Sequence, residues 1–166
     1  LESLKYFFVK NNTYSNVFIT NLSTVVNTNC LRPMLSKNVS CQSVKGYYSW
    51  KHPGQKHVDY YFPSGAGTLL TRETVTKILD FSETKNLNVC PNFDDTFLGY
   101  ALYHLNLHIT ELKRIDVLSK EDCARHLRSP KFLEYPHIRI KTDPRDKNIE
   151  LKTHEFAYNA IYGESI

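Results

Sequence analysis

The chain has 166 residues, of which 41% are hydrophobic and 23% are charged. This composition is typical of a packed domain and excludes a disordered tail. The formal net charge of +4 is too small to indicate a nucleic-acid-binding protein. No apolar run reaches the length of about 18 residues that predicts a transmembrane helix. We therefore expect one domain over residues 1–166, with no nucleic-acid partner and no transmembrane segment.

The four cysteines do not form a zinc motif, because no two of them stand in a C-x-x-C pair. Their even number is compatible with disulfides in an oxidising compartment and equally with buried free thiols. The first residues contain neither an initiator methionine nor a signal-peptide pattern. We therefore expect the chain to be a piece of a longer protein.

Short predicted elements and polar stretches alternate over the first sixty residues. Residues 1–10 place their apolar side chains on one helical face. The apolar run Val17–Ile19 predicts a buried strand, and residues 31–35 predict a short helix that Pro33 disturbs. Residues 36–60 are polar and contain glycine and proline, so they predict an irregular segment.

Two helices are predicted in the middle of the chain. Residues 68–70 predict a strand, and Thr71 is positioned to cap the helix after it, whose apolar stripe begins at Val75. The clearest helical pattern begins at Asp94 or Asp95, either of which can serve as its N-cap. Its apolar residues stand at positions 97, 98, 101, 102 and 105.

The last third of the chain predicts alternating strands and helices. Residues 107–109 predict a strand, and Ser119 begins an S-x-x-D capping pattern for a helix over 120–128. Residues 137–141 alternate polar and apolar side chains, as a half-buried strand does, and residues 147–162 predict a closing helix. Neither a G-x-G-x-x-G fingerprint nor a P-loop is present. This mixture predicts an α/β fold whose sheet has mostly short strands.

Asp94 and Asp95 form the first candidate catalytic group. They lie where a loop enters the predicted helix, and one of the two carboxylates can cap that helix. The other can face a cleft and accept a proton from a substrate hydroxyl. The alternative is a cap with a solvated neighbour, which the spacing alone favours.

The segment Ser64-Gly65-Ala66-Gly67 is the second candidate, and it lies between an aromatic stretch and an apolar strand. Paired glycines permit a close approach of the backbone to a ligand, or a turn, which we expect at a sheet edge. Trp50, in an aromatic cluster earlier in the chain, suits stacking on a sugar ring. The alternatives are a plain tight turn and a loop that its aromatic residues pack onto the core.

Asn21 and Ser23 follow the strand predicted at residues 17–19. Ligands of open α/β sheets gather at the carboxyl ends of strands, and these two side chains alternate on one side. Both are able to reach a phosphate or a ribose. The alternative is a polar turn with no ligand.

His137, Arg139 and Lys141 alternate along the last predicted strand, so all three lie on one face. Such groups repel each other unless an anion lies between them. A diphosphate suits Arg139, and His137 is then free to ligate a metal. The alternative is an edge strand that uses charge against aggregation. We interpret His104 and His108 as structural, because a predicted helix end lies between them.

Taken in chain order, these pieces resemble the GT-A-type glycosyltransferases. The strand with Thr-Asn-Leu-Ser, then Pro-Ser-Gly-Ala-Gly, then Asp-Asp-Thr-Phe-Leu-Gly and a late histidine are similar to the β-1,3-galactosyltransferase and Fringe-like group. They are also similar to related bacterial and large-DNA-virus sugar transferases. The likeness runs from about residue 14 to about residue 141 and is strongest over Tyr61–Tyr100.

The resemblance implies a hexosyltransferase that moves a sugar from a nucleotide sugar, most typically a UDP-sugar, to a hydroxyl of a glycan or glycoprotein acceptor. It implies that Asp95 is the general base for a direct displacement with inversion at the anomeric carbon. Asp94 then caps the helix or binds an acceptor hydroxyl. Residues 64–67 and Trp50 line the cleft on the acceptor side.

On the donor side, the resemblance implies that Asn21, Ser23, Arg139 and Lys141 bind the diphosphate. It also implies a site for Mn²⁺ or Mg²⁺ that His137 completes. The family places a D-x-D motif where this chain has Thr-Asn-Leu-Ser, which contains no carboxylate. The metal ligands of the family are therefore incomplete in this sequence.

The implied fold is a GT-A-like mixed sheet flanked by helices. Only residues 1–19 precede the Thr-Asn-Leu-Ser motif, so we expect part of the N-terminal nucleotide-binding half to be missing. The resemblance leaves the compartment open, with the cytoplasm expected for a bacterial or viral protein and the Golgi lumen for a eukaryotic one.

Two other functions remain open at this point. A non-catalytic carbohydrate-binding or degenerate transferase domain agrees with the absent D-x-D motif and the incomplete N-terminal half. A glycosidase needs two carboxyl groups roughly 5–10 Å apart on opposite sides of the scissile bond. The adjacent residues Asp94 and Asp95 cannot easily straddle a bond in that way.

Overall fold

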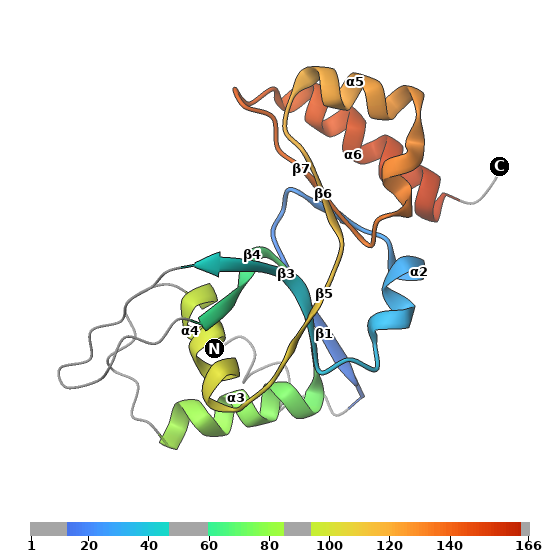
Figure 1. The fold of residues 1–166 in the computed structure, drawn as a ribbon. Helices are drawn as coiled ribbons and strands as arrows, with labels where there is room; N and C mark the ends of the chain where they lie inside the picture. The colour runs from blue at the N-terminus through green and yellow to red at the C-terminus, as the bar shows by residue number, and fades with distance from the viewer. Residues whose placement is uncertain (1–12, 47–59, 85–93, 164–166) are drawn as a thin grey trace. The chain divides into compact units, whose positions relative to one another are not determined.

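The computed structural model describes residues 13–46, 60–84 and 94–163, and over these ranges the chain folds as two units (Figure 1). Unit 1 comprises Leu1–Ile19 and Leu35–Glu111, and unit 2 comprises Thr20–Met34 and Leu112–Ile166. Each unit is therefore built from segments that are far apart in the sequence. Both units combine helices with a mixed sheet, which confirms the α/β class.

Two predictions fall outside the ranges that the structure describes. One is the helix predicted over residues 1–10, and the other is the aromatic cluster that contains Trp50. None of the helices within the described ranges is both long and apolar enough to cross a membrane.

Unit 1 contains a four-stranded sheet in the order β1-β4-β3-β5. β3 pairs with β4 in the antiparallel sense and with β5 in the parallel sense. The elements are β1 (Asn16–Thr20), β3 (Val39–Gly46), β4 (Tyr60–Thr71), α3 (Arg72–Thr84), α4 (Asp94–His104) and β5 (Ile109–Glu111).

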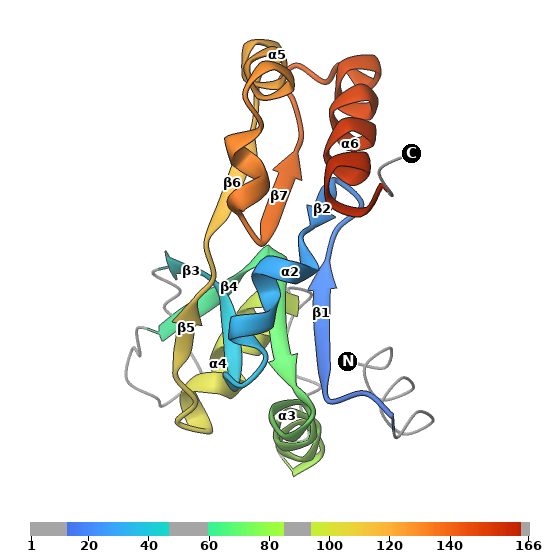
Figure 2. The ribbon, with the colours of Figure 1, turned by 90° about the vertical axis from the view of Figure 1, so that its right-hand side faces the viewer.

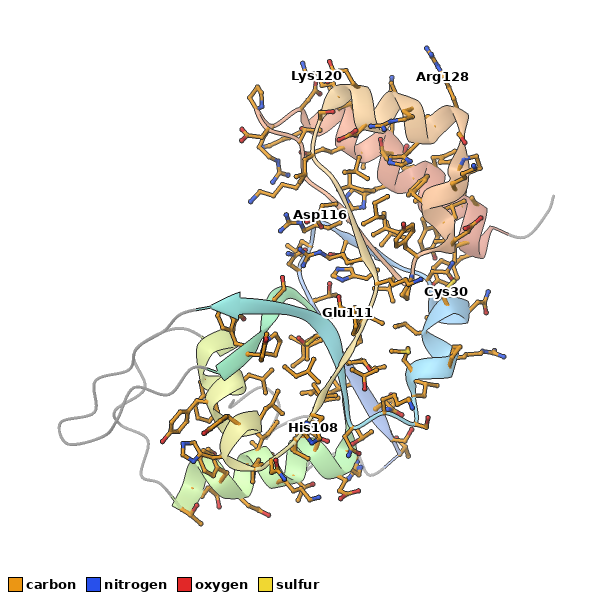
Figure 3. All side chains as sticks on the ribbon, viewed as in Figure 1. Cys30, His108, Glu111, Asp116, Lys120 and Arg128 are labelled. Atoms are coloured by element: carbon orange, nitrogen blue, oxygen red, sulfur yellow. The ribbon has the colours of Figure 1, made fainter. Side chains whose placement is uncertain are left out.

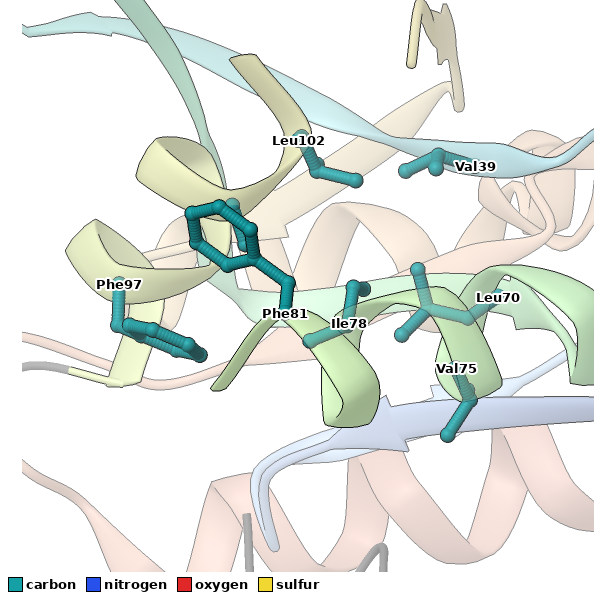
Figure 4. Packing of buried hydrophobic residues seen from close by; sticks show 8 residues of the cluster. Val39, Leu70, Val75, Ile78, Phe81, Phe97 and Leu102 are labelled. Carbon is teal, nitrogen blue, oxygen red and sulfur yellow. The ribbon is translucent and has the colours of Figure 1, made fainter. Parts of the chain in front are cut away.

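The core of unit 1 forms where α3 and α4 pack on the sheet (Figure 4). α3 carries the predicted apolar stripe, and Thr71 caps it by accepting a hydrogen bond from the Thr74 amide at 3.3 Å. α4 is also confirmed, and its inward face is buried as its pattern predicts. The buried cluster comprises Val39, Leu70, Val75, Ile78, Phe81, Phe97, Ala101 and Leu102.

The prediction that residues 36–60 are irregular is wrong over β3. This strand buries Ser40 and Cys41, so its sequence lacks the alternation of large apolar residues that marks a strand. Its pairing with both β4 and β5 satisfies the backbone and defines it as a strand. The strand predicted at Val17–Ile19 is confirmed within β1, but it is only half-buried because β1 lies at the sheet edge.

The strand predicted at residues 107–109 begins two residues later, as β5, because the end of α4 occupies the first of them. The Leu107 amide donates to the Leu102 carbonyl at 2.9 Å, and the Asn106 amide donates to the Tyr103 carbonyl at 3.1 Å. Asn106 has a φ of 51°, the left-handed conformation that closes a helix in this way.

Unit 2 contains a three-stranded sheet in the order β2-β7-β6. β7 pairs antiparallel with β2 and parallel with β6. The elements are β2 (Thr24–Val26), α2 (Thr28–Leu31), the 3-10 helix η1 (Arg32–Met34), β6 (Arg114–Val117), α5 (Lys120–Arg128), the 3-10 helix η2 (Pro130–Glu134), β7 (His137–Ile140) and α6 (Lys147–Tyr162).

The sheet of unit 2 has one apolar face and one polar face. Ile138 and Ile140 of β7 are buried in the core with residues of α5 and α6. Because side chains alternate along a strand, His137 and Arg139 lie on the opposite face. This confirms the alternating strand that the sequence predicts. The buried cluster comprises Val25, Val117, Cys123, Phe132, Ile138, Ile140 and Ala157.

The helix starts in unit 2 follow the local sequence. Ser119 accepts a hydrogen bond from the Asp122 amide at 2.9 Å, which confirms the predicted S-x-x-D cap of α5. Asp146 caps α6 by accepting from the Asn148 and Ile149 amides. Residues 31–35 form the end of α2 followed by η1, which agrees with a short helix disturbed by Pro33.

Glu150, in the first turn of α6, ties that helix to the end of β7. Its Oε1 accepts from the Thr142 amide at 2.6 Å and from the Thr142 hydroxyl at 2.8 Å, and Arg145 donates to its Oε2 at 2.5 Å. Burial raises the pKa of Glu150, but the bonds from Thr142 and Arg145 outweigh burial and hold the pKa below its usual value. The charged carboxylate therefore stabilises the fold.

We predict that Glu150→Gln lowers the free energy of unfolding at pH 7 by about 2 kcal/mol, because the charge-assisted bonds are lost in a buried place. The matched control is Glu155→Gln, since Glu155 is exposed on the same helix. Urea unfolding of both variants measures the difference. In the wild type, this contribution is lost as the pH falls through the lowered pKa, because protonation removes the acceptor charge. Equal stabilities of the two variants would contradict the role of Glu150.

Candidate functional site

The candidate residues fall into two groups, one in each unit. The first group lies in unit 1 and comprises the acidic pair at the start of α4 and the glycine-containing segment of β4. The second group lies in unit 2 and comprises Asn21, Ser23 and the polar residues of β7. Each group is described by the contacts within its own unit.

Residues 64–67 form a bulge inside β4 and not a turn at a sheet edge. The pairing of β3 with β4 steps from Cys41↔Thr68 to Ser43↔Pro63. Four residues of β4, 64 to 67, therefore face the single position 42 of β3. β4 also lies inside the sheet, between β1 and β3. The expectation of an edge turn is wrong, and so is the alternative of a plain tight turn, because the strand continues through the glycines.

Helix α4 lies very close to β4 at Gly99. A Cβ atom added at Gly99 would lie 2.8 Å from the Cα of Phe62 and 3.0 Å from the carbonyl oxygen of Tyr61. Only glycine allows the helix backbone to lie so near the strand. The Asp-Asp-Thr-Phe-Leu-Gly and Pro-Ser-Gly-Ala-Gly motifs are therefore brought together by this contact.

The spacing along each element sets how near the motifs come. Asp95 precedes Gly99 by four residues, which is a rise of about 6 Å in a helix. Ser64 follows Phe62 by two residues, which is about 7 Å along a strand. Asp95 and Ser64 therefore each lie roughly 6 to 7 Å along their own element from the same contact.

Asp94 and Asp95 are the first two residues of α4. The amino end of a helix carries unpaired amide groups and partial positive charge, which favour a carboxylate. Asp95 is partly buried. The side chain of Asp94 lies outside what the structure describes, so its predicted role as cap or acceptor ligand stays a prediction, as does the role of Trp50.

In unit 2, a chain of hydrogen bonds joins Asn21 to His137 through Thr24. The Asn21 Oδ1 accepts from the Ser23 amide at 3.1 Å and from the Thr24 hydroxyl at 2.9 Å. The Thr24 Oγ1 lies 3.3 Å from Nε2 of His137. Because the Thr24 hydroxyl proton goes to Asn21, the geometry favours the tautomer in which His137 donates from Nε2. Asn21 and His137 are therefore linked through Thr24, whereas a common cleft that also includes Ser23, Arg139 and Lys141 stays a prediction.

Beside His137, one carboxylate holds two guanidinium groups. Asp116 is labelled on β6 in Figure 3. Its Oδ1 lies 2.8 Å from Nε of Arg114. Its Oδ2 accepts from a terminal guanidinium nitrogen of Arg114 at 3.0 Å and from one of Arg139 at 3.1 Å. The parallel register of β6 and β7, with Asp116 opposite Arg139, produces this arrangement. The side chain of Arg114 is only 9% exposed, so the pair with Asp116 is largely shielded from solvent.

The basic residues of β7 already have an anion beside them within unit 2. The sequence suggests that His137, Arg139 and Lys141 need an external anion, but Asp116 already supplies one from a neighbouring strand. The edge-strand alternative is also wrong, because β7 is the central strand of its sheet. Lys141 follows β7 and has an exposed side chain.

His137 is uncharged in this environment. Its side chain is buried, and burial lowers its pKa to about 4, with Arg114 and Arg139 acting in the same direction and Asp116 against it. Two arginines and one aspartate then leave this polar face with a charge of about +1 near neutral pH. This charge still favours the binding of an anion, but less strongly than three positively charged side chains at His137, Arg139 and Lys141 would.

The metal site implied by the resemblance can be compared with these contacts. Asn21 gives its side-chain oxygen to two donors, and His137 points Nε2 at Thr24. A hard divalent cation prefers anionic oxygens, and two arginines near His137 repel it. Across the three described ranges, no group of three His, Cys, Asp or Glu residues is arranged to hold a metal. Asn21, Ser23 and His137, as they are bonded here, do not fit a metal centre.

Sequence reasoning missed Asp116 and Gly99. Asp116 belongs to β6, whose Arg-Ile-Asp-Val alternation is the signal that could have identified it as a strand with Arg114 and Asp116 on one face. Gly99 stands inside a predicted helix, where glycine is costly unless a close contact requires it. His104, interpreted as structural, packs its ring against Tyr100 at 4.3 Å and Phe81 at 5.8 Å.

Comparison with known proteins gives no family for the chain. No protein-family model matches the sequence, and no curated protein matches it either. The candidate roles therefore depend on the residues and on the geometry of the two units.

We predict that His137 makes the fold sensitive to acid. Its pKa is about 4 in the folded state and 6.5 in the reference state, so the unfolded chain binds the proton first as the pH falls. Between pH 7 and pH 4, the wild type should therefore lose about 3 kcal/mol more stability than His137→Gln, which does not titrate. Urea unfolding at several pH values measures this difference.

The comparison with His137→Gln is needed because His126 and His154 also have lowered pKa values and titrate in both proteins. Parallel pH profiles of the wild type and His137→Gln would contradict a buried neutral His137.

Proposed function

We propose that this chain is the catalytic part of a glycosyltransferase, which moves a sugar from a nucleotide sugar to a hydroxyl acceptor with inversion. A GT-A-like architecture, with UDP-sugar as donor and a glycan or glycoprotein as acceptor, belongs to this proposal. The observation that carries it is the contact of Gly99 with Phe62. This contact joins the two motifs that most resemble the glycosyltransferases, although about thirty residues separate them in the sequence.

The geometry of unit 1 suits the acceptor side of such a reaction. The bulge of β4 contains two glycines, which have no side chain to block a close approach of a sugar to the backbone, although Gly67 itself is buried. A carboxylate stands at the amino end of α4, and a carboxylate can accept a proton from an acceptor hydroxyl. These two features are the ones that a transferase needs on the side of the attacking hydroxyl.

In the proposed reaction, Asp95 takes the proton of the acceptor hydroxyl. The acceptor oxygen forms a bond to the anomeric carbon while the bond from that carbon to the diphosphate oxygen breaks. Attack from the face opposite the leaving group inverts the configuration. The nucleoside diphosphate leaves with the bonding electron pair, and protein cations are required to offset its charge.

For unit 2 taken by itself, we propose that Arg139 and Lys141 bind the diphosphate group of a nucleotide. Arg139 has part of its guanidinium engaged by Asp116, and its buried Nε has no hydrogen-bond partner among the described residues. An anion that binds Arg139 must therefore compete with Asp116 or bind the nitrogen atoms that Asp116 leaves available. Lys141 is exposed and brings a second positive charge without such competition.

A non-catalytic sugar-binding or degenerate transferase domain is the second candidate. The observation that favours it is the bonding of Asn21, which uses its side-chain oxygen within its own turn and stands where the family has a carboxylate. Such a domain would bind sugars through unit 1 without cleaving a donor. Donor hydrolysis measured with a panel of sugar nucleotides separates the two candidates.

We predict that Asp95→Asn reduces transfer and donor hydrolysis by about 100-fold or more, because the amide cannot accept the proton. The matched control is Asp80→Asn, since Asp80 is exposed on α3 of the same unit. The measurement is release of UDP from a panel of UDP-sugars, with circular dichroism to verify the fold of each variant.

Activity of Asp95→Asn near the wild-type level, together with an inactive Asp94→Asn, would move the role of base to Asp94. If both variants keep their activity, the acidic pair is not catalytic. A wild type that releases no UDP from any donor supports the non-catalytic candidate.

We predict that Arg139→Ala weakens binding of uridine diphosphate by about tenfold or more, which is the expected loss of one charge-assisted contact. Asp116→Asn should strengthen binding, because it removes the internal competitor for Arg139. Calorimetry with and without manganese measures both effects. The matched control is Arg125→Ala, because Arg125 is an exposed arginine of unit 2 that also pairs with an aspartate.

Unchanged affinity in Arg139→Ala would end the diphosphate role of β7. An absolute requirement for manganese would show that a metal carries the diphosphate contact in place of the arginine.

A further inference from the structure

Unit 2 contains a groove that none of the candidate roles above uses. It lies where α6 passes beside the edge strand β2 (Figure 2) and has a volume of 480 Å³. β2 forms one wall, and α6 forms the other. The residues that α6 contributes are His154, Glu155, Tyr158, Asn159 and Tyr162.

Two tyrosines make the α6 wall aromatic. The rings of Tyr158 and Tyr162 have their centroids 5.3 Å apart with an angle of 47° between their planes. Tyr158 is 59% exposed and Tyr162 is 39% exposed, although exposed rings of this size lose the energy that burial would give. An aromatic surface left open inside a groove is typical of a ligand-binding wall.

Two polar side chains, Glu155 and Asn159, line the groove beside the tyrosines. Glu155 and Asn159 are one helical turn apart, and on the same helix Asn159 directly follows Tyr158 while Glu155 precedes it by three positions. A carboxylate and an amide can accept from and donate to hydroxyl groups. Among the residues that the structure describes, no lysine or arginine lines this groove, so a phosphate or another anion would meet Glu155 without a compensating charge there. The lining therefore suits a neutral ligand with several hydroxyl groups.

A peptide strand is not the expected occupant of the edge of β2. The strand has only three residues, and the Tyr162 hydroxyl donates to the Val26 carbonyl at the end of it. The same hydroxyl accepts from the Thr28 amide at 3.2 Å. Tyr162 thus occupies backbone groups that an added strand would need.

We propose that the groove between β2 and α6 binds a neutral sugar ring, which stacks on Tyr158 and forms hydrogen bonds with Glu155 and Asn159. A pyranose has an apolar face of C–H groups and a rim of hydroxyls, which match the two tyrosines and the two polar side chains. This site is independent of the proposed transfer reaction, because it uses no residue assigned to that reaction.

The test is saturation-transfer NMR on the full chain with the methyl β-glycosides of galactose, glucose and N-acetylglucosamine, without any nucleotide. At least one of them should receive saturation in the wild type. Tyr158→Ala should reduce the signal by about tenfold or more, whereas Tyr158→Phe should keep it because stacking needs only the ring. Glu155→Gln should weaken the affinity by about fivefold, as expected for loss of one charged hydrogen bond.

The matched control is Tyr103→Ala, since Tyr103 is 50% exposed on α4 of unit 1. This variant should keep the signal. The proposal is overturned if no glycoside receives saturation, or if Tyr158→Ala equals the wild type. It is also overturned if uridine diphosphate, and not a glycoside, gives the signal that depends on Tyr158. Sugar binding that depends on Tyr158 while donor hydrolysis is absent would contradict only the transferase function.

Discussion

The polar face of unit 2 depends on the ion pairs that the carboxylate of Asp116 forms with two arginines. Arg114 and Arg139 lie on neighbouring strands of one small sheet, and their guanidinium groups would repel each other without an anion between them. Asp116 binds both, so the arginines are held in fixed positions near the buried His137. Asp116 by itself raises the pKa of His137, but burial and the two arginines outweigh this effect, so His137 is uncharged.

This arrangement changes how the basic residues of β7 are to be interpreted. A cluster of basic side chains with no carboxylate of the protein among them indicates a bound anion. A basic cluster that contains such a carboxylate is partly neutralised and can be structural. Buried ion pairs are weak evidence for stability, but the removal of one partner is costly because it leaves a charge uncompensated. Asp116 therefore competes with any diphosphate for Arg139. If the cluster is an anion-binding site, removal of Asp116 strengthens diphosphate binding, whereas a purely structural cluster shows no such change.

Unit 1 depends on a steric constraint. Helix α4 can approach β4 only because position 99 has no side chain, and the acidic pair and the glycine bulge are positioned by that approach. The two units thus offer different chemistry: carboxylates and a glycine-containing bulge in unit 1, guanidinium groups and an aromatic groove in unit 2.

The sequence by itself determined the elements whose signals are local. The Ser119 cap, the apolar stripe of α3, the helix over 147–162 and the alternation in β7 all depend on residues within a few positions of each other, and each is confirmed. The tertiary structure alone decided the features that depend on distant pairing. β3 is a strand because of its neighbours, residues 64–67 bulge because of the register with β3, and Asp116 reaches Arg139 across 23 positions of sequence. Such contacts cannot be predicted from hydrophobic periodicity, because periodicity reports only on residues that are near in sequence. Which residues of two strands face each other is decided by the register in which the strands pair.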